Sequence, residues 1–221
     1  MTAKEREGKG MARYGMLIDL RRCVGCFACV MACKAEHTTP KGVTWNRVIV
    51  AEKGDYPEAR MSFTPVLCNH CSHPPCLKVC PTGATTKRGD GIIMVNQKIC
   101  IGCQYCVVAC PYQARSFNKK SEGYFAEYGL TPFEQQGYKQ HVKGTPGKCS
   151  FCYERVDQGL DPACTVSCPG RARIFGDLDD PQSEISTLLQ EHETFQLIKN
   201  QGTGPAVYYI AESGAAERRE G

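Results

Sequence analysis

The sequence predicts a loop-rich α+β fold in which one small unit recurs about four times. Three observations predict it. The 221-residue chain contains 16 cysteines, which fall into four groups of four. Strand-like runs precede the first and third groups, and helix-like runs end them. The chain also contains 22 glycines and 13 prolines, a composition typical of short elements joined by many loops.

The four cysteine groups share one spacing pattern. Groups one and three read C-x2-C-x2-C-x3-C, group two reads C-x2-C-x4-C-x3-C, and group four widens the middle gap to eleven residues. A proline follows the last cysteine of groups two, three and four, and an alanine comes three residues after each proline. The sequence therefore contains an internal repeat, in which the prolines and alanines recur together with the cysteines. These residues are Pro81, Pro111, Pro169, Ala84, Ala114 and Ala172.

The predicted strands and helices surround the cysteine loops. Residues 14–18 (YGMLI) and 91–95 (GIIMV) read as short strands that turn into cysteine loops. The runs VMAC and VVAC, which end groups one and three, read as the starts of short helices. Strand, cysteine loop and helix make up the half-unit of a bacterial ferredoxin. Residues 44–51 and 61–67 have the β-branched and aromatic content of further strands.

The remaining segments are less regular. Residues 116–148 show no consistent helix or strand periodicity. A loop of that length inside a compact domain is usually functional or an interface element. Asp180 and Pro181 predict the N-cap and first residue of a helix with one apolar face, and residues 206–211 predict a strand before a charged tail. The apolar face of the helix contains Ile185, Leu188 and Leu189.

The cysteine spacing predicts ligands of iron–sulfur clusters. Three cysteines at x2 spacing turn the backbone around three corners of a four-iron cube, with amide N–H groups facing the sulfides. In two-cluster ferredoxins the fourth cysteine, which precedes a proline, ligates the other cluster. The 16 cysteines therefore predict four [4Fe–4S] clusters with no cysteine left over.

The order of the groups predicts how they pair. Only a short segment separates Cys80 of group two from Cys100 of group three, a natural connection within one ferredoxin, so groups one and four pair across the chain. With the fourth cysteines exchanged within each pair, four ligand sets follow. They are site 1 (Cys23, Cys26, Cys29 and Cys168), site 2 (Cys33, Cys149, Cys152 and Cys164), site 3 (Cys68, Cys71, Cys76 and Cys110) and site 4 (Cys80, Cys100, Cys103 and Cys106).

This pairing predicts two ferredoxin-like domains, one inserted in the other. Domain I would comprise residues 14–62 and 143–180, and domain II would comprise residues 63–115. The other predicted parts are a flexible N-terminal tail (1–13), an interface loop (116–142) and a C-terminal helix, strand and tail (181–221).

Disulfides and structural zinc are the alternative uses of these cysteines. Neighbouring thiols at CxxC spacing are poor partners for stabilising cross-links, and the first residues have no apolar segment of the kind found in secretion signals. Structural zinc sites usually combine two separated CxxC pairs, and that arrangement fits three cysteines at x2 spacing poorly. Iron–sulfur ligation is therefore the preferred interpretation.

The five histidines are less informative than the cysteines. His70 and His73 lie within group two, where each could donate a hydrogen bond to a cluster sulfide and raise its potential. Loop histidines that face solvent are an equally good interpretation. The other three, His37, His141 and His192, are expected at the surface, and Trp45 is expected in the core.

Composition excludes several classes of function. The formal charge of +4 is too small to argue for nucleic-acid binding, and no run approaches the ~18 apolar residues that a membrane-spanning helix needs. Arg21 and Arg22 form a twin arginine, but Cys23 follows at once, so an export signal is not expected there. The sequence contains no GxGxxG, no Walker loop and no credible Ser/His/Asp arrangement, so no catalytic residue is predicted.

The motifs YGMLIDLRRCVGCFACVMACK, CNHCSHPPCLKVCPTGA and CIGCQYCVVACPY, with the long gap in group four, resemble one known family over residues 14–180. This family comprises the electron-transfer subunits of dimethyl-sulfoxide-reductase-family molybdoenzymes. It includes the iron–sulfur subunits of polysulfide, thiosulfate, tetrathionate, dimethyl sulfoxide and respiratory arsenate reductases. The segments GDLDDPQS and TGPAVYYI are similar to the arsenate and sulfur-compound branches.

The resemblance implies a non-catalytic subunit that transfers electrons from cluster to cluster in anaerobic respiration of a sulfur or arsenic oxyanion (or related) substrate. Site 1 would face a large catalytic subunit holding molybdopterin (with Mo or W), and site 4 would lie near a membrane quinone-binding anchor subunit or a cytochrome. Family members commonly cross the membrane folded, with the signal of the catalytic partner. A peripheral position on the extracytoplasmic side of the cytoplasmic membrane is therefore expected, and the cytoplasmic face is the alternative.

A free-standing polyferredoxin that shuttles electrons between soluble enzymes is the alternative function. Such shuttles tend to be acidic and to lack large interface elements. The segment 116–148 and the extension 181–221 favour a docked subunit instead.

Overall fold

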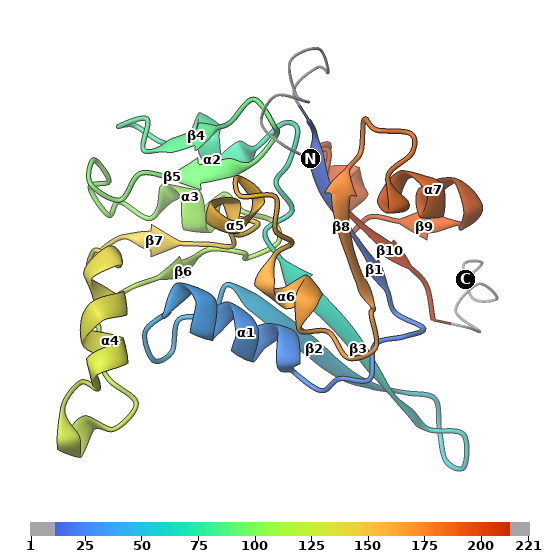
Figure 1. The fold of residues 1–221 in the computed structure, drawn as a ribbon, viewed down its shortest axis with the longest axis horizontal. Coiled ribbons are helices and arrows are strands. Elements are labelled where there is room, and N and C mark those ends of the chain that lie inside the picture. Colours follow the sequence, from blue (N-terminus) through green and yellow to red (C-terminus); the bar gives the residue numbers. More distant parts are fainter. Residues whose placement is uncertain (1–11, 213–221) are drawn as a thin grey trace.

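The computed structural model describes residues 12–212, and its largest sheet joins the two ends of this range (Figure 1). The sheet has the strand order β8-β1-β10-β9. Strand β1 pairs parallel with β10 and antiparallel with β8, and β10 pairs antiparallel with β9. The bounds are β1 Tyr14–Asp19, β8 Arg173–Asp177, β9 Thr194–Phe195 and β10 Val207–Ile210.

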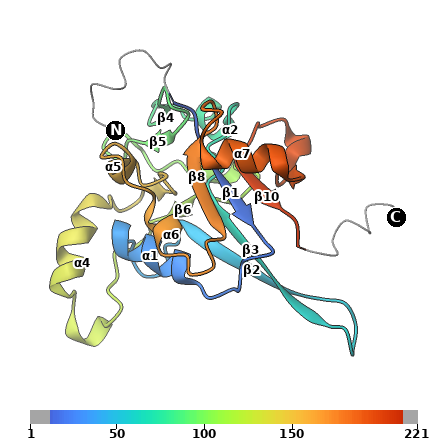
Figure 2. The same ribbon diagram turned by 45° about the vertical axis from the view of Figure 1, so that its right-hand side comes forward.

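Both faces of this sheet are covered, and the alternation of side chains along β1 shows how. Met16 and Ile18 point to one face, where they pack with cysteines of the four groups, whereas Leu17 points to the other. All three side chains are fully buried. A strand that is apolar on both faces is typical of the centre of a layered fold. Figure 2 shows helix α7 (Glu184–Glu191) on one side of the sheet and helices α1 (Ala28–His37) and α6 (Ala163–Val166) on the other.

Helix α7 (Glu184–Glu191) begins three residues later than the sequence predicted. Asp180 instead closes a turn, in which its Oδ1 accepts the N–H of Gln182. Ser183 is the N-cap, and its Oγ accepts the N–H of Ser186. The predicted apolar face is confirmed, because Ile185, Leu188 and Leu189 pack against the side of the sheet that carries Leu17.

The remaining strands of residues 12–212 form three two-stranded antiparallel sheets. The strands expected at 44–51 and 61–67 form one long antiparallel hairpin, and the strand expected at 91–95 pairs with the strand that follows group two. The third two-stranded sheet pairs residues on either side of the irregular segment after group three. The bounds are β2 Asn46–Lys53, β3 Arg60–Leu67, β4 Thr85–Lys87, β5 Ile93–Val95, β6 Ser116–Phe117 and β7 Pro146–Gly147.

Short helices carry the third cysteine of every group, and the first of them also carries the fourth cysteine of its group. The helix predicted at the end of group one runs for ten residues, whereas the helices at the other groups are single turns. The bounds are α1 Ala28–His37, α2 Pro75–Lys78, α3 Tyr105–Val108, α5 Tyr153–Val156 and α6 Ala163–Val166. Helix α1 packs against α6, and α2 packs against α3.

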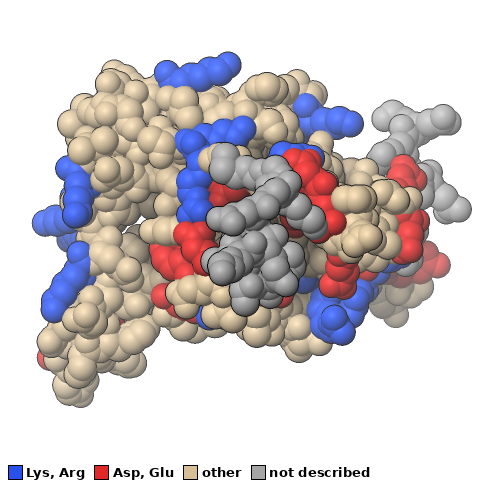
Figure 3. Space-filling model, turned by 45° about the horizontal axis from the view of Figure 1, so that its top comes forward, with Lys and Arg blue, Asp and Glu red and all other residues tan. Residues whose placement is uncertain are grey.

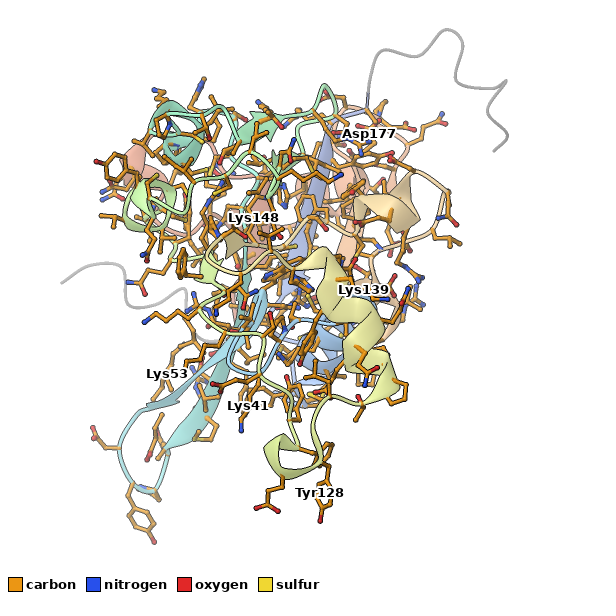
Figure 4. The ribbon with its side chains drawn as sticks, turned by 90° about the vertical axis from the view of Figure 1, so that its left-hand side faces the viewer. Lys41, Lys53, Tyr128, Lys139, Lys148 and Asp177 are labelled. Atoms are coloured by element: carbon orange, nitrogen blue, oxygen red, sulfur yellow. The ribbon has the colours of Figure 1, made fainter. Side chains whose placement is uncertain are left out.

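The segment expected as an interface loop contains regular structure. It holds α4 (Pro132–Gly137) between short 3₁₀ turns at Ala126–Tyr128 and Tyr138–Gln140. A capping box starts α4, since Thr131 Oγ1 accepts the N–H of Glu134 while the Glu134 carboxylate accepts the N–H of Thr131. The sequence T-P-F-E carries this signal, which periodicity alone missed. Figure 4 shows Tyr128 at the tip of this arm, pointing away from the rest of the protein.

The face drawn in Figure 3 has no large basic patch among its described residues. On that face, small groups of basic and acidic side chains are set in a larger neutral surface. Among residues 12–212, no helix is long and apolar enough to cross a membrane. Residues 1–11 of the predicted N-terminal tail (1–13) and residues 213–221 of the predicted C-terminal part (181–221) lie outside the described residues.

Candidate metal centres

The repeat seen in the cysteine spacing recurs in the backbone. In every group the residue directly before the second cysteine has a positive φ, a left-handed conformation that turns the chain sharply. Two of these residues are glycines, which adopt it without strain. The four angles are 67° at Gly25, 42° at His70, 72° at Gly102 and 53° at Phe151. Each group therefore forms the same kind of loop around its first cysteines.

A second repeated turn follows the last cysteine of groups two to four. It ends in a backbone N–H that donates to the sulfur of that cysteine: Ala172 N lies 3.3 Å from Cys168 Sγ, and Ala114 N lies 3.5 Å from Cys110 Sγ. In group two the donor comes one position later in the repeat, since Thr85 N lies 3.4 Å from Cys80 Sγ. The same backbone turn therefore places an amide donor beside the sulfur in each of these groups.

Three of the four predicted ligand sets each line one cavity. The cavity of site 1 is lined by Cys23, Cys26, Cys29 and Cys168, that of site 3 by Cys68, Cys71, Cys76 and Cys110, and that of site 4 by Cys80, Cys100, Cys103 and Cys106. The repeated alanines lie beside these cavities and are buried: Ala172 at site 1, Ala114 at site 3 and Ala84 at site 4. A small side chain at this position leaves the space between the cysteines open.

The four cysteines of site 2 lie close together in the interior. All four, Cys33, Cys149, Cys152 and Cys164, are buried. Burial raises the pKa of the Cys149 thiol, and the charges of the other three raise it further. Such mutual effects require that the four sulfurs are near neighbours. The structure thus brings together every cysteine set that the sequence predicted.

These sites suit a bound cluster better than bare thiols or a single ion. Burial raises the pKa of Cys71 to about 12 and that of Cys152 to about 12, so both thiols stay protonated at neutral pH unless a positively charged group replaces the proton. Within residues 12–212, no three Cys, His, Asp or Glu side chains converge closely enough to hold one metal ion. The cavities enclosed by four cysteines fit a polynuclear iron–sulfur group, which needs room between its ligands.

His37 is not the surface residue that the sequence predicted. Its side chain is only 8% exposed, and its Nε2 lies 3.2 Å from Cys152 Sγ of site 2. The imidazole packs against Trp45, and the His37 carbonyl accepts a hydrogen bond from Nε2 of His141, which is also buried. His37 stands four residues after Cys33, where the other groups have alanine. That departure from the repeat is the signal that sequence reasoning missed.

Replacing His37 by phenylalanine is expected to lower the reduction potential of the group bound at site 2. The ring and its packing on Trp45 are kept, but the hydrogen bond to Cys152 Sγ is lost. Such bonds stabilise the more negative reduced state, so a shift on the order of 50 mV is expected. Potentiometric titration followed by electron paramagnetic resonance (EPR) measures it. An unchanged potential would show that the contact has no electronic role.

The two histidines of group two differ from each other. His70 is buried and stacks on Phe151 with ring centroids 3.8 Å apart, and its Nδ1 accepts the N–H of Ile93. Its Nε2 is buried without a hydrogen-bond partner among the described residues. His73 is exposed and fits the solvent-facing interpretation. His192, outside this group, is half-buried.

Three buried cations lie beside the sites. They are Arg115, Arg173 and Lys148, and Figure 4 shows Lys148 within the body of the protein. Lys148 Nζ donates to the carbonyl of Ile93 and, at 2.8 Å, to the carbonyl of Cys149. Buried cations are costly unless negative charge compensates them. Their position fits sites that carry net negative charge when loaded.

Comparison with known proteins agrees with this chemistry. Two family models, both described as a 4Fe–4S dicluster domain, match the chain, one at residues 22–84 and the other at residues 59–127 and 128–178. The chain is thus an iron–sulfur protein with repeated dicluster domains.

Several curated proteins are similar along most of their length. The arsenate respiratory reductase iron–sulfur subunit ArrB of Shewanella sp. strain ANA-3 is 41% identical over 91% of this chain and 97% of its own. A tetrathionate reductase subunit of Salmonella typhimurium is 42% identical over 95% of this chain and 76% of its own. A selenate reductase subunit of Mesobacillus selenatarsenatis is 40% identical over 88% and 70%. The chain belongs to the family of iron–sulfur subunits of dimethyl-sulfoxide-reductase-family molybdoenzymes.

Proposed function

We propose that this chain binds four [4Fe–4S] clusters and conducts electrons between two partner proteins docked at its opposite ends. The observation that carries the proposal is that Cys26 of site 1 and Cys103 of site 4 are exposed, whereas the cysteines of sites 2 and 3 are buried or partly buried. When bound, each cluster supplies a one-electron redox couple. The protein holds the sites close together and excludes water from the middle ones.

Charge effects between cysteines of different sites support the order 1-2-3-4. Cys29 of site 1 has Cys164 of site 2 among the charges that raise its pKa after burial. Cys68 of site 3 acts in the same way on the pKa of Cys149 of site 2. Burial raises the pKa of Cys106 of site 4, and Cys76 of site 3 raises it further. Each site thus has the next one as its electrostatic neighbour.

The boundary between sites 2 and 3 is filled by aromatic rings. His70 lies between the first two cysteines of group two, and Phe151 occupies the same position in group four. Their stacked rings join the loops of the two sites at an interplanar angle of 25°. Two loops with the same backbone turn therefore meet face to face without intervening solvent.

The two terminal sites each have an exposed cysteine and an apolar surface. Cys26 of site 1 and Cys103 of site 4 are exposed, whereas sites 2 and 3 have none. Exposed apolar side chains flank both: Val24 and Phe27 beside Cys26, and Ile101, Tyr105 and Val108 near Cys103, with Val108 86% exposed. Clusters of apolar residues on a surface are typical of protein interfaces. Both ends therefore suit electron exchange with a docked partner.

We propose the domain arrangement predicted from the sequence, with domain II inserted in domain I. Strand β1 leads into group one and pairs with β8, which follows group four, and α1 packs against α6. Strands β4 and β5 join groups two and three, and α2 packs against α3. These contacts support the pairing of groups one with four and two with three.

The relatives indicate the partners. Their names assign them to arsenate, tetrathionate and selenate reductases as subunits, and the arsenate reductase relative as the iron–sulfur subunit. By this analogy we place a large molybdopterin catalytic subunit at site 1 and a membrane quinone-binding subunit or a cytochrome at site 4. The substrate would be an oxyanion of sulfur, arsenic or a related element, and the complex would lie on the extracytoplasmic side of the membrane.

Co-expression with the proposed catalytic subunit tests the proposal. The chain is expected to co-purify with that subunit, to contain about 16 iron atoms, and to show a broad visible absorption that dithionite bleaches. A stable brown monomer that binds no large subunit would favour the polyferredoxin shuttle. A colourless protein that contains zinc would exclude iron–sulfur function.

A further inference from the structure

Two buried arginines occupy equivalent positions in the repeat. Arg115 and Arg173 each stand five residues after the last cysteine of their group, Cys110 and Cys168. The corresponding residues of groups one and two are Thr38 and Thr85, which carry no charge. One arginine therefore belongs to the half that holds sites 3 and 4, and the other to the half that holds sites 1 and 2.

Arg173 lies between sites 1 and 2. Its side chain lines the cavity of site 1, and its Nη1 lies 3.7 Å from Cys164 Sγ of site 2. Its Nη2 donates to Asn46 Oδ1 at 2.9 Å, and Asn46 in turn donates to the carbonyl of Cys29 at 3.0 Å. Arg173 is 3% exposed. The guanidinium is thus held in a fixed position against both sites by neutral and sulfur acceptors.

Arg115 has the matching position between sites 3 and 4. It is 5% exposed and lines the cavity of site 3, and within the described residues its side-chain interactions are with the sulfurs of Cys76 of site 3 and Cys106 of site 4. Burial lowers its pKa, whereas the charges of these two cysteines raise it, and the net effect is a rise. A buried guanidinium is strongly destabilising unless a nearby anion compensates it. The sulfur ligands of sites 3 and 4 are the negative groups that surround it.

We infer that Arg115 and Arg173 are shared counter-cations, each raising the reduction potentials of both clusters in its half of the chain. The inference rests on the proposed function, because it requires four loaded sites. It assigns these arginines as positioning residues for electron transfer, since they are not ligands.

The physical argument is electrostatic. An oxidised [4Fe–4S] cluster with four thiolates carries about −2, and one-electron reduction makes it about −3. A fixed positive charge in a low-dielectric interior stabilises the more negative state, so the potential rises. Because one guanidinium lies against two sites, it raises the reduction potentials of both clusters in its half of the chain together. Arginine remains protonated at all accessible pH values, so this contribution does not vary with pH.

Charge removal on one side of the chain tests the inference. In the complex with the catalytic subunit, Arg115→Gln is expected to lower the midpoint potentials of the clusters at sites 3 and 4 and to leave those at sites 1 and 2 unchanged. Arg173→Gln is expected to do the reverse. Arg115→Lys and Arg173→Lys keep the charge and are expected to retain the wild-type potentials. EPR-monitored potentiometric titration at two pH values measures all four variants, and the shifts are expected to be equal at both.

The outcomes separate the inference from the proposed function. Wild-type protein with fewer than four clusters would contradict the proposed function itself. Four clusters whose potentials do not respond to Arg115→Gln, or that all shift equally, would overturn the inference alone. If Arg115→Gln fails to assemble clusters at sites 3 and 4, Arg115→Lys decides: potentials equal to wild type support the role of the charge, and lowered potentials refute it.

Discussion

Cys110→Ser is expected to remove the cluster of site 3, although Cys110 belongs in sequence to the group that supplies three ligands of site 4. Cys110 lines one cavity with Cys68, Cys71 and Cys76, and it does not line the cavity of site 4. The loss of one ligand leaves three cysteines around a buried space. Iron content is expected to fall from about 16 to about 12 atoms per chain if the whole cluster is lost, or to about 15 if three irons remain.

Double variants identify which cluster is lost. Cys110→Ser combined with Cys71→Ser is expected to affect one cluster only, because both residues line the cavity of site 3. Cys110→Ser combined with Cys103→Ser is expected to affect two, because Cys103 lines the cavity of site 4. Iron analysis and EPR of the reduced proteins provide the measurement. If the second combination removed only one cluster, the exchange of fourth cysteines would be wrong.

Gly102→Ala is expected to disrupt site 4. Gly102 precedes Cys103, has a φ of 72°, and a Cβ built on it would overlap the carbonyl oxygen of Gly144. The left-handed backbone alone costs a non-glycine residue about 1–2 kcal/mol. The overlap adds more, because a backbone oxygen cannot rotate away as a side chain can. We expect loss of the site 4 cluster and a lower midpoint of thermal unfolding.

Gly129→Ala is the matched control for this change. Gly129 has a φ of 73°, and a Cβ built on it would meet no atom within 4 Å. It is expected to show the backbone strain alone, with the full complement of iron. If Gly102→Ala retained all its iron and unfolded at the same temperature as Gly129→Ala, close packing of this loop against Gly144 would not be needed for site 4.

Local signals in the sequence predicted most of the secondary structure around the sites. Strands form at the predicted runs 14–18, 44–51, 61–67 and 91–95. Each run has alternating or continuous apolar residues bounded by turn residues, a signal that can be recognised in the sequence without knowing the rest of the fold. The same local reasoning placed the start of α7 at Asp180, although Ser183 is the cap. Both residues are good N-caps, and contacts of the Ser183 and Ser186 hydroxyls with the carbonyl of Asp177 favour the later one.

The residues that tune the sites could not be found in the same way. His37 reaches Cys152 across 115 residues of sequence, and Arg173 reaches Asn46 across 127. Nothing near His37 or Arg173 in the sequence marks either as buried, and polar residues of these types usually lie at the surface. His37 stands where the other three groups have alanine, and Arg173 shares its repeat position with Arg115, whereas the other two groups have threonine there.

The sequence by itself determined the number of cysteine groups and the family, because the spacing within each group is a local property of its loop, and it predicted the ligand sets from the order of the groups. The tertiary structure alone decided what lies between the sites: the His70–Phe151 stack, the His37 contact with Cys152 and the two buried arginines. These depend on which loops meet after folding, and burial there makes each hydrogen bond and charge count far more than it would in water.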